Sequence, residues 1–302
     1  MTTYVFPGQG SQFVGMSRDF YENFKVARNI FEEISDYTKI DLKNIIFEDK
    51  ENKLNITNFT QVAIFTASVS IFKTIKSEKD LQLSEIDTML GHSLGEYSAL
   101  ACSEKVNLKD CSLILKKRGE LMNNAVTANE TGMAALIGLN AEQIKKIIYE
   151  NKINLEIAND NSPMQIVVSG DLKHLEESRE IFIKNNVKKF VRLNVSAAFH
   201  SKYMINAQTI LSEEIDKLNF NHNTVNIISN HSSLASNNNI EIKNSLKKQM
   251  ASTVRWTESI KTLIELGEKN IVEIGPNKVL SGLINRISKN FNIKSITEVT
   301  EI

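Results

Sequence analysis

The chain has 302 residues, of which 41% are hydrophobic and 24% charged, the composition of an ordinary globular protein. Its 36 basic and 36 acidic side chains balance, which argues against a global basic field for binding nucleic acid. No apolar run approaches the ~20 residues that a membrane-spanning helix needs. The N-terminus lacks the pattern of a signal peptide, so we expect a cytoplasmic protein that binds neither nucleic acid nor membrane.

Neither a metal nor a cofactor is predicted. No Cys/His cluster has the spacing of a metal site. The glycine-rich loop Pro-Gly-Gln-Gly-Ser-Gln at residues 7–12 lacks the Gly-Lys-Ser/Thr ending of a Walker loop and the spacing of a dinucleotide fingerprint. Cys102 and Cys111 fall in helical stretches, where we expect buried free thiols, as in a reducing compartment.

The first part of the chain alternates strands with helices. Residues 3–6 predict a strand, and the loop at 7–12 lets backbone N–H groups approach a ligand closely. Apolar residues recur at helical spacing over residues 18–37, and residues 58–75 are apolar enough for a buried helix. A strand at residues 86–90 follows.

The stretch Gly91-His92-Ser93-Leu94-Gly95 has the form G-x-S-x-G, between that strand and a helix-prone run at 96–103. This context is typical of a nucleophile elbow, in which a serine occupies a strained corner and only glycines leave room around it. The corner exposes Ser93 Oγ and places backbone N–H groups where they can face a developing oxyanion. Arg118, on a helix predicted over 107–124, follows closely enough to act near the site.

The middle of the chain has the order β-α-β-β-α-β, which predicts a ferredoxin-like subdomain inserted into a larger one. The expected strands are residues 132–139, 155–159, 165–169 and 188–193, and the expected helices 141–150 and 171–185, with Asp171 as a cap. The remaining elements are helices over 202–218, 242–251, from 253 onward and up to 289, and strands over 225–229 and 270–274. This alternation predicts a parallel sheet covered by helices on both faces. The Asn/Ser-rich segment 230–239 is expected to be a mobile loop.

A serine nucleophile needs a base, and His200 is the candidate because it lies in a small-residue loop at the start of a helix. His92 adjoins the serine, whereas the three other histidines lie in polar surroundings typical of a solvated surface. No Asp or Glu is placed by a motif between Ser93 and His200. A backbone carbonyl could orient the imidazole equally well, because the second ring N–H needs only an acceptor.

Taken together, the motifs resemble the malonyl-CoA:acyl carrier protein transacylase family over nearly the whole chain. They are PGQGSQ at 7–12, GHSLGEYSAL at 91–100, RG at 118–119, FHS at 199–201, VRW at 254–256 and EIGP at 273–276. The resemblance implies an α/β-hydrolase-like large subdomain at residues 1–128 and 194–302, with a ferredoxin-like insert at 129–193. Thr253 departs from the family pattern, which often has proline there.

The resemblance also implies roles for individual residues. Ser93 is the nucleophile, His200 the base, and Arg118 the ligand of the malonyl carboxylate. The backbone N–H groups of Gln9 and Leu94 form the oxyanion hole, and the main-chain carbonyl of Arg255 orients His200. Pocket positions with a weaker claim are His92, Met122, Asn159, Asn161 and Phe199.

The implied reaction is ping-pong transfer of malonyl from malonyl-CoA to the phosphopantetheine thiol of acyl carrier protein, for fatty acid biosynthesis. A monomer is expected, with Lys188, Lys189, Arg192 and Lys202 as candidates for docking an acidic carrier. The alternatives are a serine esterase or thioesterase with an acid before the histidine, the malonyl loader of a polyketide system, and a non-catalytic carrier-binding subunit.

Overall fold

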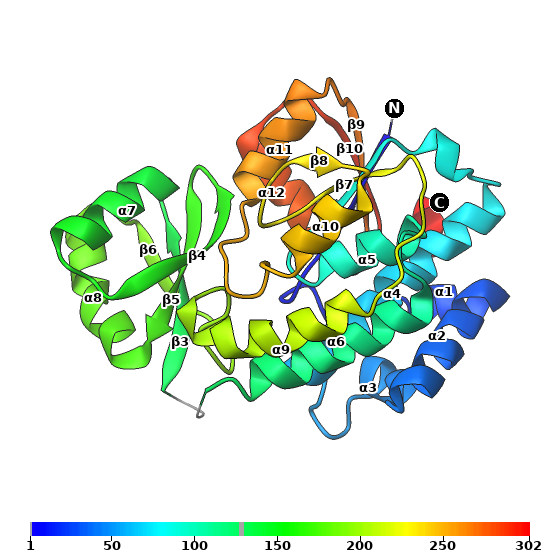
Figure 1. The fold of residues 1–302 in the computed structure, drawn as a ribbon, viewed down its shortest axis with the longest axis horizontal. Coiled ribbons are helices and arrows are strands. Elements are labelled where there is room, and N and C mark those ends of the chain that lie inside the picture. Colours follow the sequence, from blue (N-terminus) through cyan, green and yellow to red (C-terminus); the bar gives the residue numbers. More distant parts are fainter. Residues whose placement is uncertain (1, 127–129) are drawn as a thin grey trace.

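Two sheets organise the computed structural model, which describes residues 2–126 and 130–302 (Figure 1). The larger has the spatial order β10 (Asn292–Ile296), β9 (Asn270–Ile274), β1 (Thr2–Phe6), β2 (Thr88–Gly91), β7 (Asn226–Ile228) and β8 (Ala235–Ser236). Its strand pairs are parallel except β7–β8, which is antiparallel. The predicted α/β class with a mainly parallel sheet is therefore confirmed, and β2, which leads to Ser93, lies inside the sheet.

Helices cover both faces of this sheet, because successive side chains on each strand point to opposite sides. Tyr4 and Phe6 join the larger apolar core, whereas Val5 joins the core that includes Trp256. The larger core is built by α1 (Arg18–Asn23), α2 (Lys25–Thr38), α3 (Leu42–Phe47), α4 (Thr57–Glu78), α5 (Gly95–Cys102), α6 (Leu108–Asn123), α9 (Ile205–Asp216) and α10 (Asn239–Leu246). The other core is built by α11 (Trp256–Glu265) and α12 (Val279–Ile287), which lie together in Figure 1.

The helix α4 is buried nearly all round, as its apolar sequence predicts, and contacts α2, α5 and α6. Cys102 and Cys111 are buried free thiols, as expected. Among the described helices, none combines the length and apolarity needed to cross a bilayer. Short 3-10 turns complete the fold: η1 (Leu83–Glu85), η2 (Lys202–Met204) and η3 (Val299–Glu301).

The smaller sheet is antiparallel and forms a separate lobe with its two helices, to the left in Figure 1. Its spatial order is β4 (Leu155–Ser162), β5 (Gln165–Asp171), β3 (Thr131–Ile137) and β6 (Lys189–Arg192), with α7 (Ala141–Glu150) and α8 (Leu172–Lys184). The chain order β-α-β-β-α-β and this strand order are those of a ferredoxin-like unit. The carboxylate of Asp171 accepts a bond from the His174 N–H, so the predicted cap is confirmed. The predicted boundary at residue 128 lies outside the described residues, and the subdomain limits stay a prediction.

Four stretches differ from the expected elements. The helix expected over 18–37 is broken at Phe24, whose backbone is extended (φ −122°, ψ 127°). The helix expected at 242–251 begins earlier, at Asn239, because the Asn238 side chain caps it by accepting two backbone N–H bonds, and it ends at Leu246. Strand β10 was not expected, and segment 230–239 contains strand β8.

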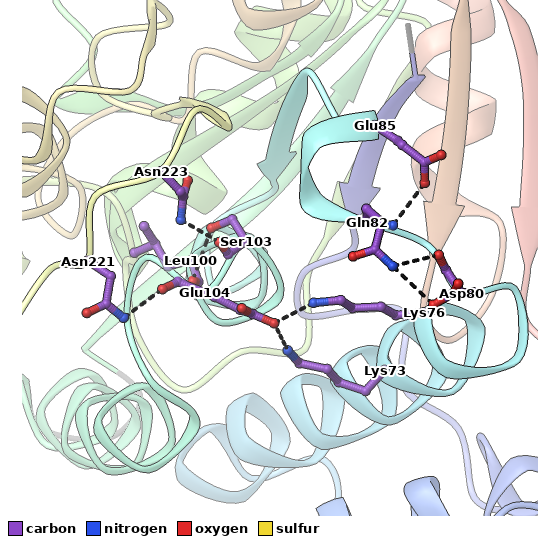
Figure 2. Close-up of polar contacts among 10 residues, drawn as sticks. All are labelled: Lys73, Lys76, Asp80, Gln82, Glu85, Leu100, Ser103, Glu104, Asn221 and Asn223. Atoms are coloured by element: carbon purple, nitrogen blue, oxygen red, sulfur yellow. Dashed lines mark hydrogen bonds and ion pairs between the residues drawn. The ribbon is translucent and has the colours of Figure 1, made fainter.

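The C-terminal end of α5 is fixed by polar contacts, drawn in Figure 2. Lys73 and Lys76 of α4 each place Nζ on Glu104 Oε1, at 2.9 and 2.6 Å. Asn221 Nδ2 donates to the Glu104 carbonyl and Asn223 Nδ2 to the Ser103 carbonyl, at 2.9 and 2.8 Å. These contacts join α5 to α4 and to the loop before β7, and so hold the helix that follows the candidate nucleophile.

Candidate active site

Ser93 lies on a sharp turn between β2 and α5, with its backbone in the left-handed region (φ 53°). The flanking glycines are required sterically. A Cβ on Gly91 would lie 2.0 Å from the carbonyl carbon of Gly95, and a Cβ on Gly95 would lie 2.2 Å from the Phe6 carbonyl oxygen. Both distances are far inside van der Waals contact, so the predicted nucleophile elbow is present in geometry as well as in sequence.

His200 reaches the serine from the loop between β6 and η2. Its Nε2 lies 2.9 Å from Ser93 Oγ, and its ring is buried, with 4% of the residue exposed. Nδ1 lies 3.1 Å from the Gln249 carbonyl oxygen and 3.2 Å from the Ser252 carbonyl oxygen. Because two acceptors face Nδ1, we assign the proton to that nitrogen. Nε2 then has a free lone pair and can accept the serine proton.

The expectation that the Arg255 carbonyl orients His200 is wrong. Arg255 is the N-cap of α11, and its carbonyl oxygen accepts bonds from the backbone N–H and the hydroxyl of Ser259, both at 2.9 Å. The first turn of the helix therefore uses the oxygen that was expected to face the imidazole. The carbonyls of Gln249 and Ser252 take that place instead.

Burial and, after it, the positive charge of Arg118 lower the pKa of His200 to about 3. The imidazole is therefore neutral near pH 7, which is the form a general base needs. Burial also lowers the pKa of His92, whose Nε2 lies 2.8 Å from Asn161 Oδ1. A neutral His92 beside the serine adds no second positive charge to the site.

Arg118 reaches the serine from α6 and is 1% exposed. One of its terminal nitrogens, NH2, lies 3.0 Å from Ser93 Oγ and 3.0 Å from Gln249 Oε1, and the other, NH1, lies 2.7 Å from Gln61 Oε1. The guanidinium carbon lies 5.6 Å from the centre of the Tyr97 ring. A buried cation is thus directed at the nucleophile by two glutamine side chains.

A cavity of about 370 Å³ opens beside these groups, between the two lobes. The following predicted residues line it: Gln9, His92, Ser93, Leu94, Arg118, Met122, Asn159, Phe199 and His200. Asn161 is not among the lining residues, and its side chain instead forms a hydrogen bond with His92. Within the described residues, the N–H groups of Gln9 and Leu94 have no hydrogen-bond acceptor in the chain. Both could therefore donate to an oxygen in the cavity.

Sequence reasoning missed the polar groups that hold the elbow. Asn230 Oδ1 accepts from the Ser93 N–H at 2.6 Å, and its Nδ2 donates to the Gly91 carbonyl at 2.7 Å. Glu96, fully buried, accepts from the Asn230 N–H at 3.0 Å and from Gln249 Nε2 at 2.7 Å. Burial raises the pKa of Glu96, and these hydrogen bonds oppose the shift. Glu96 had a signal in the sequence, since it directly follows the G-x-S-x-G motif.

These features are typical of one class of protein. A serine in an elbow, a neutral imidazole at hydrogen-bond distance, and two backbone N–H groups without an acceptor among the described residues form the arrangement found in serine enzymes that transfer acyl groups. Among the described residues, no group of three or more His, Cys, Asp or Glu side chains could hold a metal ion.

Comparison with known proteins identifies the family. The model of the acyl transferase domain matches residues 3–301. The chain is 37% identical to the malonyl CoA-acyl carrier protein transacylase of Bacillus subtilis (strain 168), over 98% of this chain and 93% of that protein. The crystal structure of an acyl carrier protein S-malonyltransferase from Vibrio cholerae has a TM-score of 0.93 at 34% identity, covering 99% of this chain and 98% of that one.

A second similar structure is a complex of a type II polyketide synthase acyl-carrier protein with its malonyl-transacylase. Its matched chain has a TM-score of 0.94 at 31% identity, covering 99% of this chain and 97% of that one. The chain belongs to the malonyl-CoA:acyl carrier protein transacylase family and is an acyltransferase, as the resemblance of its motifs predicted.

Proposed function

We propose that this chain moves a malonyl group from malonyl-CoA to the phosphopantetheine thiol of acyl carrier protein through a malonyl-serine intermediate. The observation that carries the proposal is the meeting of two groups, an imidazole and a guanidinium, at the hydroxyl oxygen of Ser93. Ser93 Oγ lies 2.9 Å from the base His200 and 3.0 Å from the guanidinium of Arg118. A plain hydrolase needs only the first of these contacts, whereas an acyl group that ends in a carboxylate needs both.

In the first half-reaction, Ser93 Oγ attacks the thioester carbonyl while His200 Nε2 takes its proton. The N–H groups of Gln9 and Leu94 stabilise the oxyanion of the tetrahedral intermediate. The C–S bond then breaks, and His200 returns the proton to the departing CoA thiol. In the second half-reaction His200 deprotonates the carrier thiol, and the sulfur attacks the malonyl-serine ester. The ester C–O bond then breaks, and His200 returns the proton to Ser93 Oγ as the malonyl-carrier leaves.

Arg118 binds the malonyl carboxylate in this proposal. Its planar guanidinium can bond both carboxylate oxygens, which a lysine cannot reproduce. Its burial removes competing water and strengthens the pairing. Met122, Asn159 and Phe199 also line the cavity, and Asn161 acts indirectly by holding His92.

The structure disfavours the esterase reading. That reading predicts an acid at the second ring nitrogen of His200, and two main-chain carbonyls occupy that place. The choice between fatty acid and polyketide supply is finer. We propose fatty acid biosynthesis, supported by the Bacillus subtilis relative, and the similarity to the polyketide complex makes polyketide supply the second candidate.

Acyl carrier protein is the proposed partner, by analogy with the complex described above. Of the four basic candidates for docking, Arg192 and Lys202 already have polar partners, Glu176 at 3.4 Å and Asn154 at 2.9 Å. Both pairs are exposed, so they contribute little to stability and could rearrange. The monomeric state and the cytoplasmic location stay predictions.

The proposal is tested by incubating the protein with malonyl-CoA and purified holo-carrier. We expect malonyl-carrier to form and release of malonate to water to fall when the carrier is present. Ser93→Ala is the control and should form no malonyl-carrier. Fast hydrolysis that the carrier does not suppress would support the esterase reading. Offering carriers of fatty acid and polyketide type in parallel compares the two supply roles by kcat/KM.

A further inference from the structure

Arg118 has no ion-pair partner among the described residues, although it is buried. Its terminal nitrogens contact two neutral amide oxygens, Gln61 Oε1 and Gln249 Oε1, and the hydroxyl of Ser93. Buried cations are usually paired with an acid, because an unpaired charge in a low-dielectric interior is costly. A guanidinium held only by neutral groups therefore calls for an explanation.

An acid is present nearby but is kept away from Arg118. The carboxylate of Glu96 accepts from Gln249 Nε2 at 2.7 Å, while Gln249 Oε1 accepts from Arg118 at 3.0 Å. The amide of Gln249 thus lies between the acid and the guanidinium. Its orientation is fixed, because Nε2 also donates to the Ser93 carbonyl at 2.9 Å. Two acceptors hold the NH2 side, so the carbonyl oxygen must face Arg118.

We propose that the Gln249 side chain is a specificity-determining residue, which positions Arg118 without neutralising it and so reserves the guanidinium for an acyl group that carries a carboxylate. This inference rests on the proposed function. An amide oxygen orients the Arg118 guanidinium through its dipole, whereas a carboxylate at the same place would form a charge-assisted pair with the guanidinium. The incoming malonyl group would then have to compete with a carboxylate of the protein.

Gln249 therefore has two separable tasks. Its main-chain carbonyl holds Nδ1 of His200, and its side chain holds Arg118 as well as Glu96 and the Ser93 carbonyl. Loss of the last two contacts affects all acyl groups alike, whereas loss of the contact with Arg118 affects the acyl groups that carry a carboxylate. A substitution changes the side chain and keeps the carbonyl, so it acts on acyl preference through Arg118 and leaves the acceptor of the base in place. A merely structural side chain would affect all acyl groups alike.

The test measures the ratio of kcat/KM for malonyl-CoA to kcat/KM for acetyl-CoA. Acylation of the serine is followed by rapid acid quenching and mass spectrometry. In Gln249→Glu we expect this ratio to fall by about 100-fold, the scale of a desolvated charge pair. In Gln249→Met, which removes the amide and adds no charge, we expect a fall of about 10-fold from loss of positioning. A matched control is Gln165→Glu, because Gln165 Oε1 contacts Arg286 at 2.7 Å on an exposed surface. The control ratio should stay within about 2-fold of wild type.

A double variant, Glu96→Gln with Gln249→Glu, exchanges the acid and the amide between these two neighbouring side chains and keeps the net charge constant. The inference predicts that its ratio falls as in Gln249→Glu, whereas a ratio restored to wild type would mean that total charge decides and would overturn it. Ratios unchanged in both single Gln249 variants, whatever the absolute rates, would also overturn it. Circular dichroism checks folding, and if Gln249→Glu does not fold, the Gln249→Met ratio decides. A wild-type protein that forms no malonyl-serine contradicts the proposed function instead, so the two failures are distinguishable.

Discussion

Ser93 Oγ and His200 Nε2 lie 2.9 Å apart, although 107 residues separate them in the chain. Both residues have left-handed backbones, with φ of 53° and 55°. For residues with a Cβ this conformation costs about 1–2 kcal/mol each, and it persists only where neighbours enforce it. Asn230 does so for Ser93 through the Ser93 N–H, and the Gln249 and Ser252 carbonyls hold the ring of His200.

Backbone strain at the nucleophile predicts a difference between two inactive variants. Ser93→Gly removes the Cβ that makes the left-handed region costly, whereas Ser93→Ala keeps it. We expect the glycine variant to be more stable than the alanine variant by about 1 kcal/mol in urea unfolding. Equal midpoints with equal slopes would show that the turn carries no such cost.

Arg118 is expected to decide between acyl groups. Arg118→Ala should lower kcat/KM for malonyl-CoA by about 100-fold or more, because a desolvated charge pair is lost. Its relative activity on acetyl-CoA should rise, since acetyl has no carboxylate to pair. Arg118→Lys keeps the charge but not the planar fork, and should recover only part of the malonyl rate. A malonyl-to-acetyl ratio unchanged in Arg118→Ala would remove this residue from the site.

The fall of kcat/KM at acid pH that comes from protonation of His200 should occur at an unusually low pH. With the pKa of His200 near 3, the base form is lost only as the pH falls through that value, so titration of His200 should not reduce kcat/KM between about pH 5 and 8. Arg118 is the second cause of this low pKa, after burial. Arg118→Ala should therefore move the acid limb upward, toward the ordinary value of about 6.5. Acetyl-CoA is the suitable substrate, because it does not need Arg118; an acid limb that stays in place would contradict this coupling.

Phe199 should limit the size of the acyl group. Its side chain lines the cavity next to His200 and is 5% exposed, so little room is left for an α-methyl branch. Wild-type protein should use methylmalonyl-CoA poorly, and Phe199→Ala should raise that rate relative to malonyl-CoA. Equal wild-type rates for the two thioesters would refute a steric role for Phe199.

Local patterns in the sequence were sufficient to predict the elbow and the small lobe. Gly91 and Gly95 are required sterically, and both belong to one short motif that can be recognised in the sequence. The order β-α-β-β-α-β is that of a known supersecondary unit. Periodicity failed at Phe24, because the apolar spacing continues across the break between α1 and α2. Strand β10 is a short, partly exposed edge strand and has only a weak pattern.

The motifs were sufficient to predict that Ser93, His200 and Arg118 meet, but not which groups hold them in place. A main-chain carbonyl can come from any residue, so nothing in the sequence separates Gln249 and Ser252 from Arg255 as acceptors for His200. The roles of Asn230 and of the Gln249 side chain depend on contacts across 131 to 156 residues. Such contacts follow from the folded topology and not from any local spacing.

The most direct test of the central claim is the mass of the tryptic peptide that carries Ser93, taken after brief exposure of the protein to malonyl-CoA and acid quenching. We predict an increase of one malonyl group on that peptide, absent in Ser93→Ala and slowed strongly in His200→Ala. An adduct on another peptide, or labelling that survives Ser93→Ala, would contradict the assignment of Ser93 as the nucleophile.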